Sequence, residues 1–182
     1  KTFQEFFKWA YEYRLEALRN GEETPILNQM LFKGFRAQLG GHIRAILTGG
    51  APLSGECHDY IRVVMGAPVL QGYGLTETTC CATVMDMEDF ASTTKVGSPV
   101  QGAQIKLVNW EEGNYRITDQ PNPRGEIHIG GHNVALGYYK NKEKTEEDFY
   151  DGEGLRWFRT GDIGEFDKDG VIRYTSSDSV SS

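Results

Sequence analysis

The residues best suited to chemistry in this sequence are gathered in one short stretch, QGYGLTETT, from Gln71 to Thr79. Glycines at the end of a strand let backbone amides approach an anion closely. An aromatic ring can lie against a heterocycle, a hydroxyl can bind a phosphate oxygen, and a carboxylate is a hard oxygen ligand for Mg²⁺. The stretch therefore predicts a nucleotide site. A glycine-rich turn followed by a Thr/Glu helix start explains the local spacing equally well.

A second glycine turn, TGGAP, follows the strand-like run HIRAIL. Ligands of α/β proteins usually lie where strands end at the carboxyl edge of a sheet. If the two strands are neighbours, their turns form one crevice floored by peptide groups. In that crevice Tyr73 would offer its ring to a base, Thr76 a hydroxyl to phosphate and Glu77 an oxygen to Mg²⁺.

The first half of the chain predicts helices alternating with short strands. Thr2 and Glu5 have the spacing of a capping box before a helix that Asn20-Gly21 ends. We expect a second helix over about residues 26–39, a third capped by Ser54, and strands in HIRAILT and PVLQ. This order is typical of a parallel α/β sheet.

After about residue 99 the sequence becomes mainly β. The runs AQIKLVN, GEIHIGG and LRWFRTGD are separated by turn residues, and GEFDKDGVIRY predicts a hairpin rather than a calcium loop. One helix is expected over about residues 142–150, capped by Asn141 and with a solvated charged face. We therefore predict an α/β fold: a parallel-sheet layer with flanking helices (1–99), a mainly β subdomain (100–174) and a polar tail (175–182).

Composition narrows the classes of partner. The 182 residues are 38% hydrophobic and carry a net charge of -7, so the chain has no broad attraction to nucleic acid or anionic membranes. The N-terminal segment lacks the features of a signal peptide, and the apolar runs are short. Cys57, Cys80 and Cys81 form no C-x-x-C pair, which suits a reducing compartment, and we expect the adjacent pair to be small buried residues.

Two other groupings suggest chemistry less well. His128 and His132 are four apart, but no third ligand is near in sequence, so a zinc site is not expected. Ser54, His58 and Asp59 are close together, yet no G-x-S-x-G elbow surrounds the serine, and helix capping explains it better than a hydrolase triad.

Four motifs in order resemble the adenylate-forming superfamily of acyl-CoA synthetases, adenylation domains and luciferases: LTGGAPLS, QGYGLTETT, PNPRGEIHIGGHNVALGYYKN and WFRTGDIGEF. Within the superfamily, the first and third motifs are most similar to the long-chain fatty acyl-CoA synthetases. The resemblance extends from Phe3 to Tyr174 and implies the fold of part of the large N-terminal domain of these enzymes.

The resemblance also implies roles for individual residues. Tyr73 would stack on adenine, Thr76 would bind the α-phosphate and Glu77 would hold Mg²⁺. Asp162 would accept hydrogen bonds from the ribose hydroxyls, which suits an acceptor-only carboxylate. The remaining positions would line the site. Gly49, Gly50, Ala51 and Pro52 would line the adenine pocket, and Gly72 and Gly74 would shape the wall between the nucleotide and the acyl group. The GEIHIGG to GYYKN stretch would be structural, with Tyr138 and Tyr139 as packing residues.

The implied reaction is that of an ATP-dependent long-chain fatty acid–CoA ligase, which forms an acyl-adenylate and transfers the acyl group to coenzyme A. Its cofactors and partners would be ATP, Mg²⁺, the fatty acid and coenzyme A. The resemblance also implies a location at the cytosolic face of the endoplasmic reticulum or outer mitochondrial membrane. The membrane anchor of the family has no match in this sequence. The family's phosphate loop, hinge and catalytic lysine also have no match in these residues, so we expect no adenylation by this chain alone. The alternatives are a non-catalytic nucleotide-binding or interaction fragment, or another adenylate-forming subfamily.

Overall fold

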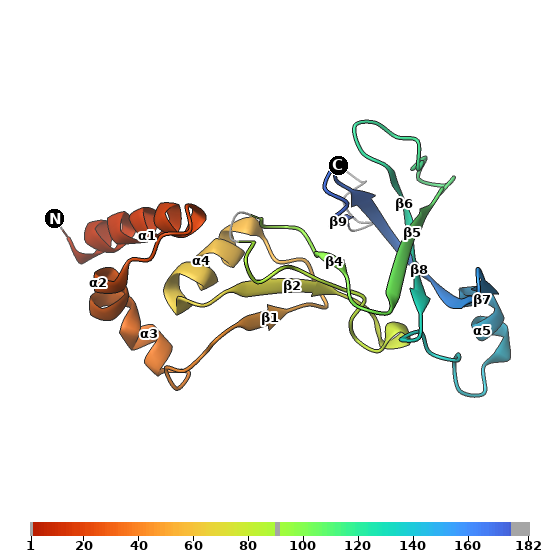
Figure 1. The fold of residues 1–182 in the computed structure, drawn as a ribbon, viewed down its shortest axis with the longest axis horizontal. Coiled ribbons are helices and arrows are strands. Elements are labelled where there is room, and N and C mark those ends of the chain that lie inside the picture. The colour runs from red at the N-terminus through yellow and green to blue at the C-terminus, as the bar shows by residue number, and fades with distance from the viewer. Residues whose placement is uncertain (1, 90–91, 176–182) are drawn as a thin grey trace. The chain divides into compact units, whose positions relative to one another are not determined.

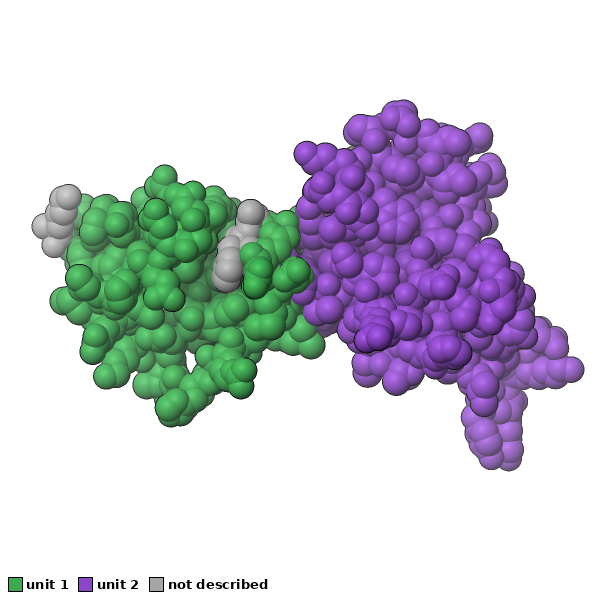
Figure 2. All heavy atoms as spheres, viewed as in Figure 1, with its two compact units in different colours: residues 1–48, 53–70, 86–94 green, residues 49–52, 71–85, 95–182 purple. Residues whose placement is uncertain are grey.

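The computed structural model describes residues 2–89 and 92–175, which form two compact units. Figure 1 gives the ribbon, and Figure 2 colours the units. Unit 1 comprises Lys1–Thr48, Leu53–Leu70 and Asp86–Thr94, and unit 2 comprises Gly49–Pro52, Gln71–Met85 and Lys95–Ser182. The chain thus passes between the units several times, and each unit is built from segments distant in sequence.

Unit 1 is mainly helical. Its elements are α1 (Phe3–Arg19), α2 (Pro25–Leu27), η1 (Asn28–Phe32), α3 (Lys33–Ala37), β1 (Ile46–Thr48) and α4 (Gly55–Met65). At the start of α1 the Glu5 carboxylate accepts a 3.0 Å hydrogen bond from the Thr2 N–H, and Gly21, with φ of 73°, follows its end. The capping and stop signals of the first helix are therefore confirmed.

The second predicted helix is found, but it is not regular. Residues 25–37 form a short α-helix, one π-helical turn and another short α-helix in succession. Phe32 in the π-helical turn is fully buried and packs with Val63 and Val64 of α4. Because a π-helical turn adds a residue to the ring closed by each hydrogen bond, the 3.6-residue hydrophobic period could not predict it.

The third helix and the two strands that flank it are as expected, although the first strand is short. The Ser54 hydroxyl caps α4 by accepting a 3.2 Å hydrogen bond from the Cys57 N–H. β1 keeps only Ile46–Thr48 of the predicted run, and β2 spans Val69–Tyr73. The two strands run in the same direction in Figure 1, as the parallel arrangement required.

Unit 2 is mainly β. Its elements are η2 (Thr76–Thr78), β3 (Thr83–Val84), β4 (Ser98–Pro99), β5 (Ala103–Val108), β6 (Arg124–Gly131), α5 (Lys142–Asp148), β7 (Phe149–Gly152), β8 (Leu155–Phe166) and β9 (Ile172–Thr175). The end of β2 pairs antiparallel with β3, and β3 with β4. The expected parallel layer therefore continues into antiparallel strands, which the glycine-rich sequence between them did not indicate.

A five-stranded antiparallel sheet forms the larger part of unit 2. Its order is β5-β6-β8-β7, with β9 also paired to β8. Ile127 and Ile129 of β6 are fully buried against Phe158 of β8 and Phe149 of β7, while Tyr73 and Leu75 pack at the edge of the same core. The alternation of β6 thus directs one face into a core on which the QGYGLTETT stretch rests.

The predicted hairpin joins β8 to β9. Asp167 accepts hydrogen bonds at Oδ1 from the N–H groups of Asp169 (2.9 Å) and Val171 (3.1 Å), and its Oδ2 lies 2.6 Å from Lys95 Nζ. Oδ1 therefore holds the turn and Oδ2 pairs with a lysine outside it, while the antiparallel pairing of β8 with β9 confirms the hairpin. The predicted polar tail begins with Thr175, the last residue of β9, and continues outside the described residues.

No helix in the described ranges, 2–89 and 92–175, is both long and apolar enough to cross a bilayer.

Candidate nucleotide site

The two glycine turns predicted to share a crevice lie next to each other in unit 2. A Cβ added to Gly49 would lie 3.1 Å from the Gly72 carbonyl oxygen. A Cβ on Gly72 would lie 2.9 Å from the Thr83 carbonyl oxygen, and one on Gly74 only 2.4 Å from that of Cys80. Backbone therefore approaches backbone closely at these glycines, and side chains there would displace the turn.

Tyr73 and Asp162 meet although 89 residues separate them in the chain. The Tyr73 hydroxyl donates a 2.7 Å hydrogen bond to Asp162 Oδ2. Tyr73 ends β2, and Asp162 lies within β8 in the RTGD segment. The fold thus joins the residue expected to stack on a base with the residue expected to bind ribose.

The residues after Tyr73 form a tight turn that the segment following β6 holds in place. Thr78 is fully buried, and its hydroxyl accepts from the Leu75 N–H at 3.0 Å. Asn133 donates through Nδ2 to the carbonyls of Thr78 and Cys81, each at 3.2 Å. The backbone of Glu77 accepts a further 2.8 Å hydrogen bond from the Ala135 N–H. Thr76 is exposed at the start of this turn.

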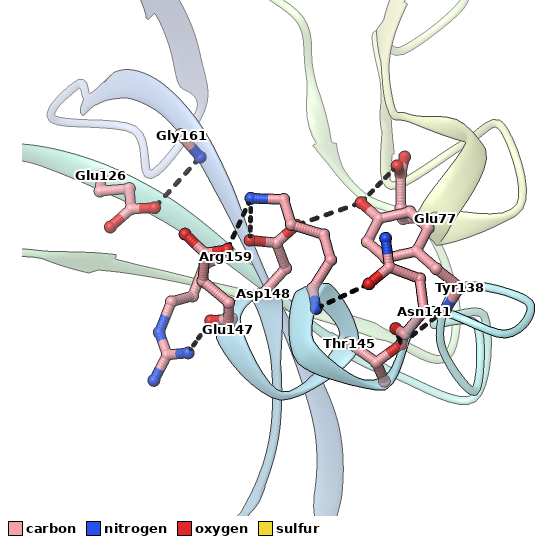
Figure 3. Close-up of polar contacts among 10 residues, drawn as sticks. Glu77, Glu126, Tyr138, Asn141, Thr145, Glu147, Asp148, Arg159 and Gly161 are labelled. Carbon is pink, nitrogen blue, oxygen red and sulfur yellow. Dashed lines mark hydrogen bonds and ion pairs between the residues drawn. The ribbon is translucent and has the colours of Figure 1, made fainter.

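The Glu77 carboxylate belongs to a hydrogen-bonded group drawn in Figure 3. The Tyr138 hydroxyl lies 2.8 Å from Glu77 Oε1 and 3.2 Å from Asp148 Oδ2, and Lys144 Nζ lies 3.1 Å from Asp148 Oδ1. Burial raises the pKa of Tyr138, and its hydrogen bond to Glu77 raises it further, so the hydroxyl stays protonated. Tyr138 therefore joins two carboxylates that are far apart in sequence.

A cavity of about 430 Å³ opens beside this group. Its lining includes four acidic residues, two basic residues and two further residues of the RTGD segment: Glu77, Glu126, Glu147, Asp148, Lys144, Arg159, Thr160 and Gly161. Four carboxylates against two cations make the cavity net negative. A phosphate would therefore need a bound cation to enter it favourably.

The expectation that Tyr138 and Tyr139 are packing residues is half correct. The Tyr138 ring packs edge-to-face on Phe149 with centroids 5.4 Å apart, but its hydroxyl also reaches Glu77. Tyr139 is 88% exposed, so the prediction that it packs is wrong. The prediction of buried fillers at the adjacent cysteines is also wrong for Cys80, which is exposed at a φ of 72°, and Cys81 is half-buried.

Two histidines from the zinc and hydrolase alternatives, His128 and His58, are buried and hydrogen-bonded within the fold. His128 is buried, with Nδ1 2.7 Å from the Tyr150 hydroxyl and Nε2 3.1 Å from Glu126 Oε2. His58 is fully buried against the Val69 carbonyl, and burial, followed by the Arg62 charge, lowers its pKa. Within residues 2–89 and 92–175, no cluster of three or more His, Cys, Asp or Glu side chains could hold a metal ion.

Sequence reasoning missed three polar residues of this site. Tyr138 and Asp148 were assigned to packing and to a solvated helix face, and Glu126 lay in a stretch expected to be structural. The alternation of GEIHIGG does place Glu126 and His128 on one face of β6, which was the available signal. The partners of that face lie on β7 and β8, and local patterns do not reveal them.

The mixed α/β fold agrees with the comparison to known proteins. Residues 13–139 match the family described as AMP-binding enzyme, and the chain belongs to this family.

Its relatives include long-chain acyl-CoA synthetases. The chain is 49% identical over 173 residues to long chain acyl-CoA synthetase 8 of Arabidopsis thaliana, covering 91% of this chain and 24% of that protein. It is 40% identical over 166 residues to fatty acyl-CoA synthetase A of Dictyostelium discoideum, again covering 91% and 24%. The chain thus spans about a quarter of the length of these curated relatives.

Solved structures support the fold. The A domain of carboxylic acid reductase from Segniliparus rugosus, in complex with AMP and a co-purified carboxylic acid, has a TM-score of 0.64 at 29% identity, covering 92% of this chain and 25% of that one. The N-terminal domain of FACL13 from Mycobacterium tuberculosis has a TM-score of 0.62 at 29% identity, covering 84% and 37%. Both are similar to this chain in its mixed α/β architecture.

Proposed function

We propose that this chain forms the adenosine and magnesium side of the active site of an ATP-dependent long-chain fatty acid–CoA ligase. The observation that supports the proposal most is the 2.7 Å hydrogen bond between the Tyr73 hydroxyl and Asp162. It brings a ring suited to a base and a carboxylate suited to ribose hydroxyls into one place. The names of the relatives supply the substrate class, a long-chain fatty acid.

The proposed reaction has two steps. An oxygen of the fatty acid carboxylate bonds to the α-phosphorus of ATP. The bond from the α-phosphorus to the oxygen that bridges it to the β-phosphorus breaks, and pyrophosphate leaves with that oxygen and the bonding electrons. The coenzyme A thiolate then attacks the acyl carbon, and AMP leaves. In the first step Tyr73 and the turn Gly49–Pro52 hold adenine, Asp162 holds the ribose, and the exposed Thr76 hydroxyl donates to an α-phosphate oxygen. Gly72 and Gly74 form the wall beside the acyl group.

Glu77 would hold Mg²⁺ in this proposal. Mg²⁺ usually keeps several waters and binds through one or two carboxylates and the phosphates of the substrate, so a single half-buried carboxylate fits it. The net negative lining of the neighbouring cavity favours a cation for the same reason. When bound, the ion would neutralise charge that develops on the phosphates.

We also propose that the ligase works in contact with an organelle membrane, at the endoplasmic reticulum or outer mitochondrial membrane. Two of the relatives are named as peroxisomal, which makes the peroxisome the competing location. Imaging of the tagged protein beside markers of the three organelles tests this location.

Calorimetric titration with AMP tests the nucleotide site. We expect binding by the chain, and weaker binding after Asp162→Ala by about tenfold or more, since a hydrogen bond to a charged group contributes about 1.5–3 kcal/mol. Tyr73→Ala should also weaken binding, because the stacking ring and the hydroxyl are both lost. ATP should bind more tightly with Mg²⁺ than without it, and Glu77→Gln should reduce this difference.

Asp151→Ala is the matched control, because Asp151 is an exposed carboxylate of the same sheet paired with Arg156. It should leave AMP affinity unchanged. Unchanged affinity in both Asp162→Ala and Tyr73→Ala, or no AMP binding by the folded wild-type chain, would contradict the proposed site.

A further inference from the structure

Asp162 projects from an irregularity in the sheet. On β6, Glu126 pairs with Ile163 and His128 with Arg159, so that the single residue Ile127 faces three residues of β8, Thr160–Asp162. Gly161, at the centre of these three, has a φ of 70°, in the left-handed region. Such bulges leave the ladder and redirect side chains, and they are common beside active sites.

Two contacts from β6 hold this bulge. The Thr160 hydroxyl donates to the Ile127 carbonyl at 2.7 Å and accepts from the Asp162 N–H at 3.0 Å. Glu126 Oε1 accepts a 3.1 Å hydrogen bond from the Gly161 N–H, as Figure 3 shows. Without Glu126, the N–H of the residue immediately before Asp162 would lose this partner.

The other side of the Glu126 carboxylate is held as well. Its Oε2 lies 3.1 Å from His128 Nε2, and His128 Nδ1 lies 2.7 Å from the Tyr150 hydroxyl. A carboxylate only accepts, so Nε2 donates to Glu126, and a neutral His128 then accepts at Nδ1 from Tyr150. The hydrogen bond from His128 lowers the pKa of Glu126 and the Gly161 N–H adds to this effect, against the desolvation that raises it, so the group is ionised at neutral pH.

We propose that Glu126 is a positioning residue for ribose recognition, which it sets by holding the Thr160–Asp162 bulge in the conformation that presents the Asp162 carboxylate. Glu126 acts through Gly161 and does not touch the nucleotide. The inference rests on the proposed function, because it assigns the ribose hydroxyls to Asp162. It deepens that function by extending the ribose site from one side chain to a supporting chain of Tyr150, His128 and Glu126.

A comparison of two ligands separates this role from general support of the fold. Calorimetry is carried out with AMP and with 2′,3′-dideoxy-AMP, which lacks the ribose hydroxyls. Glu126→Ala should weaken AMP binding about tenfold and leave dideoxy-AMP binding unchanged. Glu126→Gln keeps an oxygen that can accept from the Gly161 N–H, and it should restore AMP affinity to within about twofold of wild type.

Glu165→Ala is the control variant. Glu165 is a partly buried carboxylate of β8 that accepts a 2.7 Å hydrogen bond from Asn122. Its replacement by alanine therefore removes a carboxylate hydrogen bond from the same sheet, as Glu126→Ala does, but away from the bulge. It should change neither affinity. Equal weakening of both ligands by Glu126→Ala would show a purely structural role and overturn the inference.

Failure of the inference can be distinguished from failure of the proposed function. If wild type does not prefer AMP to dideoxy-AMP, the proposed ribose site is wrong, and the inference falls with it. If Asp162→Ala abolishes the preference but Glu126→Ala keeps it, the inference alone is overturned. Hydrogen exchange of the Gly161 amide in the wild-type protein needs no variant: protection is expected, and exchange at the rate of an unprotected amide would overturn the inference.

Discussion

The Tyr138 hydroxyl lies within hydrogen-bond distance of two carboxylates, those of Glu77 (2.8 Å) and Asp148 (3.2 Å). Tyr138→Phe keeps the ring contact with Phe149 but removes this donor. We expect the variant to lower the free energy of unfolding by about 1 kcal/mol, the usual net contribution of one intramolecular hydrogen bond. Urea titration followed by circular dichroism measures the difference.

The neighbouring residue provides the control. Tyr139 is 88% exposed, so Tyr139→Phe should leave the free energy of unfolding within about 0.5 kcal/mol of wild type. Equal losses in the two variants would contradict the role assigned to the Tyr138 hydroxyl.

Among the helices, α4 offers the clearest test of a local signal. Its N-terminal N–H groups have no partner within the helix, and the Ser54 hydroxyl accepts from one of them, that of Cys57. Ser54→Ala should destabilise the protein by about 1 kcal/mol, whereas Ser54→Gly should cost only about a few tenths of that. Thermal unfolding of the three proteins measures the order, and an alanine variant as stable as wild type would contradict the capping role.

Elements also show where local prediction succeeds. Both ends of α1, the start of α4 and the β8–β9 turn follow from residues within four positions of one another, and these were predicted correctly. The π-helical turn at Asn28–Phe32 and the antiparallel β2–β3 pair depend on packing with distant segments. A periodic pattern in one segment carries no information about such partners.

For the fold as a whole, the ion pair between Lys95 and Asp167 connects the segment before β4 to the β8–β9 turn in unit 2. Desolvation raises the pKa of Asp167, but the hydrogen bonds from Lys95, Val171 and Asp169 outweigh it, so the pKa in the folded state is lowered. Its stabilising contribution is therefore complete above the unfolded pKa of about 3.9 and is lost as pH falls below that value through the folded pKa.

This linkage predicts a pH-dependent difference between wild type and Asp167→Asn. The variant should be less stable to urea at neutral pH, and the difference should shrink at about pH 3, where protonation of Asp167 begins to remove the contribution in wild type. Asp151→Asn alters an exposed pair and should have little effect at either pH. A difference for Asp167→Asn that does not change with pH would exclude the carboxylate charge as its cause.

Some residues of the candidate site could be predicted from a short local stretch, and others could not. Tyr73, Thr76 and Glu77 lie in one short stretch, and their types alone suggested a nucleotide. Asp162 was assigned only through the resemblance of the RTGD motif to a known family. Its contact with Tyr73 crosses 89 residues, and no spacing rule reaches that far.

By itself the sequence determined the order and type of most elements, the glycine turns and the family to which the chain belongs, because these depend on neighbouring residues and on motifs. The tertiary structure alone decided that Gly49 lies against Gly72, that Tyr138 joins Glu77 to Asp148, and that Glu126 holds the turn before Asp162. Hydrogen bonds act over about 3 Å in space. Which side chains come that close is set by the packing of whole strands, so these contacts become visible only in the folded chain.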